Sequence, residues 1–227
     1  MPTALITGGS RGLGRALTLE LSAQGWDVIT TARTAADIDS VVAAGAPRVT
    51  AIAGTVRDEA HRTRLAELAG DSLDLLVNNA SYLGPSPLAE VAEFSPDELH
   101  AVYDTNVVAP LALAALLMPA LERVGGTVVN VSSDAAVEVY EGWGPYGSSK
   151  AALDHASAVL AKERPTVAVY TFDPGDMRTE MHQAAFPGED ISDRPSPESV
   201  VPALMRLISG DSASDRYTIA DLASAVR

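Results

Sequence analysis

The sequence predicts an α/β fold in which helices cover both faces of a doubly wound parallel sheet of about seven strands. Short apolar runs alternate with helical patterns along the whole chain. Most of these runs are continuously apolar, as expected for strands of a parallel sheet that are buried on both faces. No composition break divides the 227 residues, so we expect one domain over 1–227.

The expected elements follow one another in strand–helix alternation, which requires right-handed crossovers between parallel strands. Strands are expected at Thr3–Thr7, Asp27–Thr31, Arg48–Ala53, Leu73–Asn78, Gly126–Ser132, Thr166–Phe172 and Tyr217–Ala220. Helices are expected at Gly12–Gln24, Ala35–Ala43, Asp58–Ala69, Pro96–Leu121, Tyr146–Lys162 and Pro197–Ser209. The segment Asp176–Ser196 does not fit the alternation. A structureless segment of this length is often functional, and we interpret it as a substrate-binding lid, with a variable surface loop as the alternative.

The composition excludes several classes of function. The net charge of −14 repels nucleic acid and anionic lipid, so neither is an expected partner. The chain has no cysteines, which excludes disulfides and thiol nucleophiles, and its four histidines are far apart, so no metal site is expected. No signal-peptide pattern opens the chain. The apolar run Thr105–Leu121 contains prolines and predicts a buried helix, and we expect a cytoplasmic protein.

A glycine-rich loop, Thr7-Gly8-Gly9-Ser10-Arg11-Gly12-Leu13-Gly14, lies between the first expected strand and the first expected helix. Gly8 permits a tight turn, Gly12 lets the backbone approach a pyrophosphate, and Gly14 lets the helix pack against the strand. The helix N-terminus presents unpaired N–H groups to an anion. The loop therefore predicts a dinucleotide site, with a plain glycine-rich turn as the alternative.

The end of the second expected strand indicates which nicotinamide cofactor binds. An NAD site usually has an acid there for the adenine ribose, but this strand ends in Ala32 followed by Arg33. Arginine holds a 2′-phosphate by a charge-assisted bond, and Arg11 offers a second cation. The pattern predicts NADP(H); two solvated surface arginines are the alternative.

A tyrosine and a lysine form the candidate catalytic pair. Tyr146 and Lys150 are four residues apart on an expected helix, which puts both side chains on one face. A nearby ammonium favours phenolate, so we expect a lowered pKa for Tyr146 and a proton donor and acceptor nearer neutrality. A surface helical pair is the alternative. Ser132 and Ser133 end the preceding strand, where side chains reach the ligand crevice.

Taken in order, these motifs resemble the short-chain dehydrogenase/reductase family in its compact, single-domain branch. The resemblance runs from Thr3 to about Thr179, through the glycine loop, Asn78-Asn79-Ala80-Ser81, Ser133, Tyr146-x-x-x-Lys150 and Pro174-Gly175-x-x-x-Thr179. It implies a Rossmann-type sheet and an NADP(H)-dependent oxidoreductase that moves a hydride between the nicotinamide and a carbonyl or alcohol substrate.

The resemblance also assigns roles. Tyr146 is the general acid and base, Ser133 holds the substrate oxygen, Lys150 also binds the nicotinamide ribose, and Asn106 completes a water-linked proton relay. The residues expected to bind the cofactor are Gly8, Ser10, Arg11, Gly12, Leu13, Gly14, Arg33, Val56, Asn79, Ala80, Tyr146, Lys150, Pro174, Gly175, Met177 and Thr179.

Two positions depart from the family pattern. Ser81 stands where the family has glycine, and it is expected to narrow the floor beside the nicotinamide. Thr55 replaces an acid that contacts adenine, so a contact is expected only from the backbone of Val56.

Two other functions are possible on the same fold. A sensor or scaffold that binds NADP(H) without turnover would be expected to lack Tyr146 or Lys150, and an epimerase or dehydratase would need a separate substrate domain. The sequence does not identify the substrate, but candidate pocket residues are Tyr82, Leu83, Asp134, Tyr140, Trp143, Met177, Met181 and Phe186.

The helices Pro96–Leu121 and Tyr146–Lys162 are apolar on more than one face, which predicts a homodimer or homotetramer.

Overall fold

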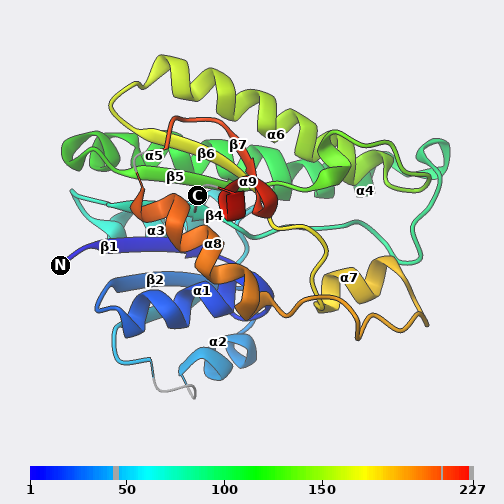
Figure 1. The fold of residues 1–227 in the computed structure, drawn as a ribbon, viewed down its shortest axis with the longest axis horizontal. Helices are drawn as coiled ribbons and strands as arrows, with labels where there is room; N and C mark the ends of the chain where they lie inside the picture. The colour runs from blue at the N-terminus through cyan, green and yellow to red at the C-terminus, as the bar shows by residue number, and fades with distance from the viewer. Residues whose placement is uncertain (43–45, 211, 225–227) are drawn as a thin grey trace.

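A parallel sheet of seven strands forms the centre of the computed structural model, which describes residues 1–42, 46–210 and 212–224. The strand order is β3-β2-β1-β4-β5-β6-β7, and every pairing is parallel (Figure 1). The strands are β1 (Thr3–Thr7), β2 (Asp27–Ala32), β3 (Val49–Ala53), β4 (Leu75–Asn78), β5 (Thr127–Val131), β6 (Ala168–Asp173) and β7 (Arg216–Thr218). The predicted doubly wound sheet of about seven strands is confirmed.

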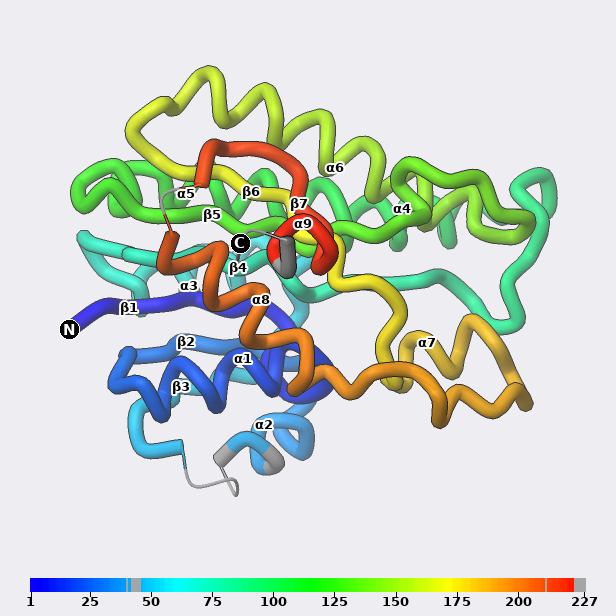
Figure 2. The backbone as a smooth tube through the Cα atoms, viewed as in Figure 1, coloured from blue at the N-terminus to red at the C-terminus, as the bar shows by residue number. Residues whose placement is uncertain are grey.

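Helices cover both faces of the sheet, and Figure 2 shows the chain crossing between the two layers. They are α1 (Gly12–Ala23), α2 (Ala35–Val42), α3 (Glu59–Ala69), α4 (Pro96–Tyr103), α5 (Ala109–Val124), α6 (Gly144–Glu163), α7 (Glu180–Ala185), α8 (Pro197–Ser209) and α9 (Ile219–Ser224). On one face α1 packs beside α8, with Leu222 of α9 in the same core. On the other face α3 packs beside α5, together with α6.

Successive strand residues enter opposite cores, which explains the continuous apolar runs. In β1, Ile6 packs under α1 and α8, whereas its neighbour Leu5 packs under α3 and α5. In β5, Val129 likewise packs under α1 and α8, and its neighbour Val128 packs under α3 and α5. A polar side chain on either face loses its hydration and needs a hydrogen-bond partner there, as Asn78 and Asn130 provide for each other.

The expected helix Pro96–Leu121 is interrupted in the middle. Ser95 and Glu98 form a reciprocal capping box that starts α4. The turns then widen into a π-helix at Asp104–Val108, which contains the buried Asn106, before α5 continues. Among the described residues, Pro96–Val124 is the one helical stretch that is long and apolar enough to cross a membrane. The buried core helix of a soluble protein can have the same length and composition.

Three further predictions need correction or limits. The expected strand Tyr217–Ala220 ends at Thr218, because the Thr218 hydroxyl accepts a bond from the Asp221 N–H and starts α9 at Ile219. The Asp176–Ser196 segment is not structureless: it contains α7, which Thr179 caps through the His182 N–H. Ala43, the expected end of the second helix, lies outside the described residues.

Candidate active site

The candidate site lies at the carboxyl ends of the strands, where parallel sheets of this order bind ligands. β1 leads into the glycine loop, β4 into Asn79 and Ala80, β5 into Ser132 and Ser133, and β6 into Pro174. Because these strands are neighbours in the sheet, the motifs that follow them come together.

The glycine loop has the conformation that its glycines allow. Gly8 and Gly12 have φ angles of +71° and +54°, a region that other residues adopt only with strain. A Cβ on Gly14 would lie 2.3 Å from both the Gly8 carbonyl oxygen and Asn79 Nδ2. Asn79 holds the loop, because its Nδ2 donates to the carbonyls of Thr7 at 2.9 Å and Gly8 at 3.1 Å. Its backbone N–H, and that of Ala80, donate to the Thr7 hydroxyl.

The start of α1 fits the phosphates of a dinucleotide. Arg11 occupies the N-cap position in an extended conformation but makes no capping bond with its side chain, and the first turn carries no acid. The N-terminal N–H groups and the helix dipole therefore favour an anion at this end. The Pro174–Thr179 turn lies against the loop, since a Cβ on Gly12 would be 3.5 Å from the Thr179 methyl carbon.

The residues expected near the adenosine lie around the end of β2. Arg33 is exposed, and Arg11 forms an ion pair with Glu180 of α7. Hydrogen bonds from Thr34 lower the pKa of the Asp37 carboxyl, and the charges of Arg11 and Arg33 contribute less to the same shift. Val56 is buried, and its carbonyl accepts a bond of 2.7 Å from Arg62.

The two candidate catalytic side chains of α6 are both buried. Tyr146 is 7% exposed and Lys150 is 2% exposed. Lys150 Nζ donates to the Val131 carbonyl at 2.7 Å and lies 5.6 Å from the centre of the Tyr146 ring. Glycine at position 147 permits the close approach of α6 to the turn after β5, because a Cβ there would lie 2.5 Å from the Ala135 carbonyl oxygen.

The expected lowering of the Tyr146 pKa is wrong for this structure. Burial raises the pKa of Tyr146 to about 12, and the nearby Ser81 and Ser133 hydroxyls offset this only partly. Burial also lowers the pKa of Lys150 to about 8, against the attraction of Asp154. Loss of hydration disfavours both charged forms, and this outweighs the attraction between ammonium and phenolate that the sequence pattern suggested.

Asn106 and Ser81 lie beside this pair. The Asn106 side chain donates to the Tyr82 carbonyl and to the Ser149 hydroxyl, both at 2.9 Å. Its Oδ1 accepts from the Tyr82 N–H at 2.8 Å and from the Ser81 hydroxyl at 3.2 Å. The sequence indicates only that Ser81 replaces the family's glycine beside the expected nicotinamide. It does not predict the contacts of Ser81 with Asn106 and Tyr146.

Ser133 lies just after β5, and its hydroxyl already makes hydrogen bonds. The hydroxyl donates to Asp134 Oδ1 at 2.9 Å and accepts from the Ala135 N–H at 3.2 Å. The other oxygen of Asp134 accepts from the Tyr140 hydroxyl at 3.0 Å. Ser133 therefore reaches the site next to a carboxylate.

Four of the eight candidate pocket residues gather around Tyr146. Leu83, Trp143, Met181 and Phe186 pack in one cluster with the Tyr146 ring. Trp143 lies edge-on to Tyr146, with 5.7 Å between ring centres, and 6.0 Å from Phe186. Met177 packs instead against the core under α1 and α8.

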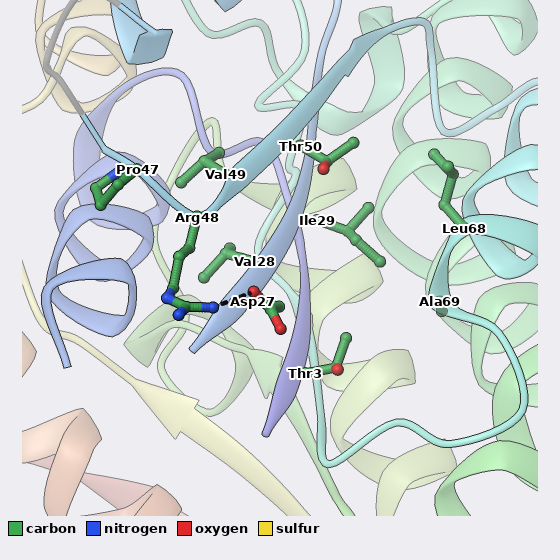
Figure 3. Close-up of a pocket in the computed structure, with 10 residues that line it drawn as sticks. All are labelled: Thr3, Asp27, Val28, Ile29, Pro47, Arg48, Val49, Thr50, Leu68 and Ala69. Carbon is green, nitrogen blue, oxygen red and sulfur yellow. Dashed lines mark hydrogen bonds and ion pairs between the residues drawn. The ribbon is translucent and has the colours of Figure 1, made fainter. Parts of the chain in front are cut away.

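A separate hollow of about 680 Å³ opens at the opposite end of the sheet (Figure 3). It is lined by the first residues of β1, β2 and β3 and by the end of α3, with an ion pair of 3.0 Å between Arg48 and Asp27. The candidate catalytic side chains do not line it.

Comparison with known proteins identifies the family. The family model described as short chain dehydrogenase matches residues 2–190, more than four fifths of the chain. This chain belongs to the short chain dehydrogenase family. A short chain dehydrogenase from Emericella nidulans is 36% identical over 185 residues, covering 75% of this chain and 68% of that protein.

Two further relatives of this short chain dehydrogenase bear on its chemistry. A benzil reductase from Bacillus subtilis, described as forming (S)-benzoin, is 33% identical over 189 residues, covering 80% of this chain and 76% of that protein. The structure of a short chain dehydrogenase from Shigella flexneri complexed with NADP is 26% identical and has a TM-score of 0.85, covering 96% of this chain and 97% of that one. Membership of the family supports an oxidoreductase that uses a nicotinamide cofactor.

Proposed function

We propose that this short chain dehydrogenase is an NADP(H)-dependent oxidoreductase that acts on a carbonyl or alcohol substrate. The observation that carries the proposal is that Tyr146 and Lys150 are buried together on α6, with the Ser133 hydroxyl within hydrogen-bonding reach of Tyr146. A bound nicotinamide supplies or accepts the hydride, and the other chemical tasks are assigned to side chains of this chain.

In the direction of reduction, Tyr146 donates a proton to the substrate oxygen. With a pKa of about 12, its hydroxyl is protonated at neutral pH and is ready to donate. After donation, the phenolate is stabilised by the Lys150 ammonium and by the Ser81 hydroxyl, which turns toward it from Asn106. The Ser133 hydroxyl rotates away from Asp134 to hold the substrate oxygen.

Lys150 has two proposed tasks. Its pKa of about 8 leaves it mostly charged at neutral pH, so it favours the phenolate of Tyr146 as that phenolate forms. It also binds the nicotinamide ribose. Asn106 orders the relay that returns a proton to the site, because its buried amide fixes the backbone of Tyr82 and the hydroxyl of Ser149.

NADP(H) is the proposed cofactor because cations surround its expected 2′-phosphate. Ala32 places no charge at the end of β2, and the exposed Arg33 follows it. Glycine-loop residues Gly8, Ser10, Gly12, Leu13 and Gly14 would hold the pyrophosphate. The turn from Pro174 to Thr179 would hold the carboxamide. The solved relative with bound NADP supports the same choice.

We also propose the substrate class, assembly and location. The apolar and aromatic wall of Trp143, Phe186 and Leu83 suits a carbonyl that carries an aromatic or bulky apolar group, and the benzil reductase relative supports this. The 176–196 segment acts as a lid over a single domain. The protein is proposed to be a cytoplasmic homodimer or homotetramer.

A panel of ketones and aldehydes, beginning with aryl ketones and benzil, tests the proposal. Oxidation of NADPH is followed with each carbonyl, and NADH is run in parallel. We expect turnover with at least one aryl carbonyl and faster turnover with NADPH. Binding of NADPH without turnover on any carbonyl would contradict the enzyme and favour a cofactor-binding sensor or scaffold.

A further inference from the structure

One arginine of the last strand contacts three segments of the candidate site at once. Arg216 of β7 donates through Nη2 to Asp173 Oδ2 at 2.8 Å and to the Ser133 carbonyl at 3.1 Å. Its Nε donates to Asp154 Oδ2 at 3.1 Å. Asp173 ends β6, and Asp154 lies on α6. One guanidinium thus ties the turn that carries Ser133 to the strand end before Pro174 and to α6.

The contacts are well shielded from water. Arg216 has 24% of its side chain exposed, Asp154 15% and Asp173 8%. When one partner of a largely buried ion pair is removed, the folded protein is strongly destabilised, because the remaining buried charge has no opposite charge beside it. The two carboxylates therefore depend on Arg216 more than the partners of a surface pair would.

Asp154 connects this cluster to Lys150. The two residues are one turn apart on the same face of α6, and the Asp154 charge supports the ammonium of Lys150. Asp154 Oδ1 and the Ser132 hydroxyl are both buried, and neither makes a hydrogen bond of standard geometry among the described residues. The Ser132 hydroxyl is still near enough to the carboxylate to favour its ionised form. The Asp154 carboxylate therefore has the Ser132 hydroxyl on one side and the Arg216 guanidinium on the other.

We propose that Arg216 is a positioning residue of the active site, which holds Asp154 one helical turn from Lys150 and fixes the backbone of Ser133 through its carbonyl. The charged and titratable groups around Tyr146 and Lys150 come from four elements. Asp134 comes from the turn after β5, Asp154 from α6, Asp173 from β6 and Arg216 from β7. Arg216 is the cation that balances two of these carboxylates, Asp154 and Asp173, on the side away from Lys150.

Two features explain why this residue does not stand out in the sequence. Arg216 lies beyond residue 190, where the family match ends. Its partners are 43, 62 and 83 residues away, so no local spacing connects them. The three-residue strand β7 places it, through the pairing of Arg216 with Thr171.

The chain allows a direct test, because it contains only two lysines, Lys150 and Lys162. In a Lys162→Arg background, protein labelled with ¹³C at lysine Cε gives one lysine side-chain signal, from Lys150, whose titration can be followed by NMR. Asp154→Asn removes the carboxylate charge and keeps the shape, so the Lys150 pKa should fall below about 8. Arg216→Met removes the opposing cation, so the same pKa should rise.

The two variants should therefore differ from each other by about one pH unit or more in the Lys150 midpoint, the range for a close charge. Arg216→Lys keeps the charge and should return the midpoint toward the wild type. Arg48→Met, which breaks the exposed ion pair at the opposite end of the sheet, serves as the matched control and should change nothing. If Arg216→Met does not fold, Arg216→Gln, which removes the charge and keeps hydrogen-bond donors for Asp173 and the Ser133 carbonyl, takes its place and should raise the midpoint in the same way.

Unchanged Lys150 midpoints in the variants, or shifts in the same direction, would overturn the proposal. The positioning role rests on the proposed function, so turnover is measured on the same proteins. Arg216→Met should lose about tenfold or more in kcat, because Ser133 loses its carbonyl anchor. Absence of turnover in the wild type would contradict the proposed function, whereas the NMR titration would still decide the charge network.

Discussion

Arg11 of the glycine loop and Glu180 of α7 form an ion pair, although 169 residues separate them in sequence. The pair joins the expected phosphate site to the 176–196 segment. Arg11 is also one of the two cations assigned to the 2′-phosphate of NADPH. Glu180 and the phosphate therefore compete for the same guanidinium.

Removing the Glu180 charge should strengthen binding of NADPH. Glu180→Gln leaves Arg11 free for the phosphate, and because both side chains are largely exposed the gain is modest, about twofold to fivefold. Fluorescence titration with NADPH and NADH measures it, and NADH affinity should stay constant. Glu189→Gln, in the same segment, is the control. An equal effect of Glu180→Gln on both cofactors would contradict competition at Arg11.

Arg33 should set the preference between the two cofactors. Arg33→Ala removes the cation beside the 2′-phosphate, so the advantage of NADPH over NADH should shrink by about 1–3 kcal/mol, the value of a hydrogen bond to a charged group. Dissociation constants for both cofactors give the difference. Arg123→Ala, an exposed arginine near the end of α5, should leave it unchanged. Equal affinity of the wild type for the two cofactors would refute the assignment.

The proposed assembly predicts a mass of two or four times 23.6 kDa in light scattering. Apolar side chains remain exposed along α4, α5 and α6, namely Leu99, Leu116, Val124 and Val159, with Val108 between α4 and α5. Leu116→Glu puts a charge into this face and should lower the mass. Val139→Glu alters an exposed valine outside these helices and should not. A monomer at micromolar concentration would contradict the prediction.

The rate of carbonyl reduction should depend on pH through Lys150. Tyr146, with a pKa of about 12, keeps its proton over the range of an ordinary assay, whereas Lys150, with a pKa of about 8, loses its charge. Raising the pH therefore removes the ammonium first, and kcat/KM should be level near neutrality and fall above about pH 8. Lys150→Arg, which stays charged, should remove this fall from whatever activity remains. A level wild-type profile to about pH 10 would contradict the role of Lys150.

Several features of the fold and site could be predicted because local spacing determines them. The strand runs have their own periodicity and the glycine loop its own spacing. Tyr146 and Lys150 share one face of α6, and Ser133 follows the strand that precedes this helix. The π-helix that holds Asn106 was not predicted, because the pattern of Pro96–Leu121 indicates one continuous helix.

Other features depend on packing that no local pattern reveals. The depth at which α6 is buried decides the pKa of Tyr146, and it reversed the expected direction. Hydrogen bonds to the hydroxyls of Thr179 and Thr218 begin the helices α7 and α9. Each helix has only six residues, too few to show a helical apolar pattern in the sequence. The contact of Arg216 with the Ser133 carbonyl spans 83 residues and follows only from strand order.

The most direct test of the account is Tyr146→Phe, assayed on a carbonyl that the wild type reduces. The substitution keeps the ring that packs against Trp143 and removes only the hydroxyl that donates the proton. Tyr103→Phe is the matched control, since its hydroxyl contacts the Ser148 hydroxyl rather than any group assigned to the reaction. We expect kcat to fall about 10²- to 10⁴-fold for Tyr146→Phe, with little change in NADPH affinity and little effect of Tyr103→Phe. Near-normal turnover of Tyr146→Phe would contradict the central claim that Tyr146 is the proton donor.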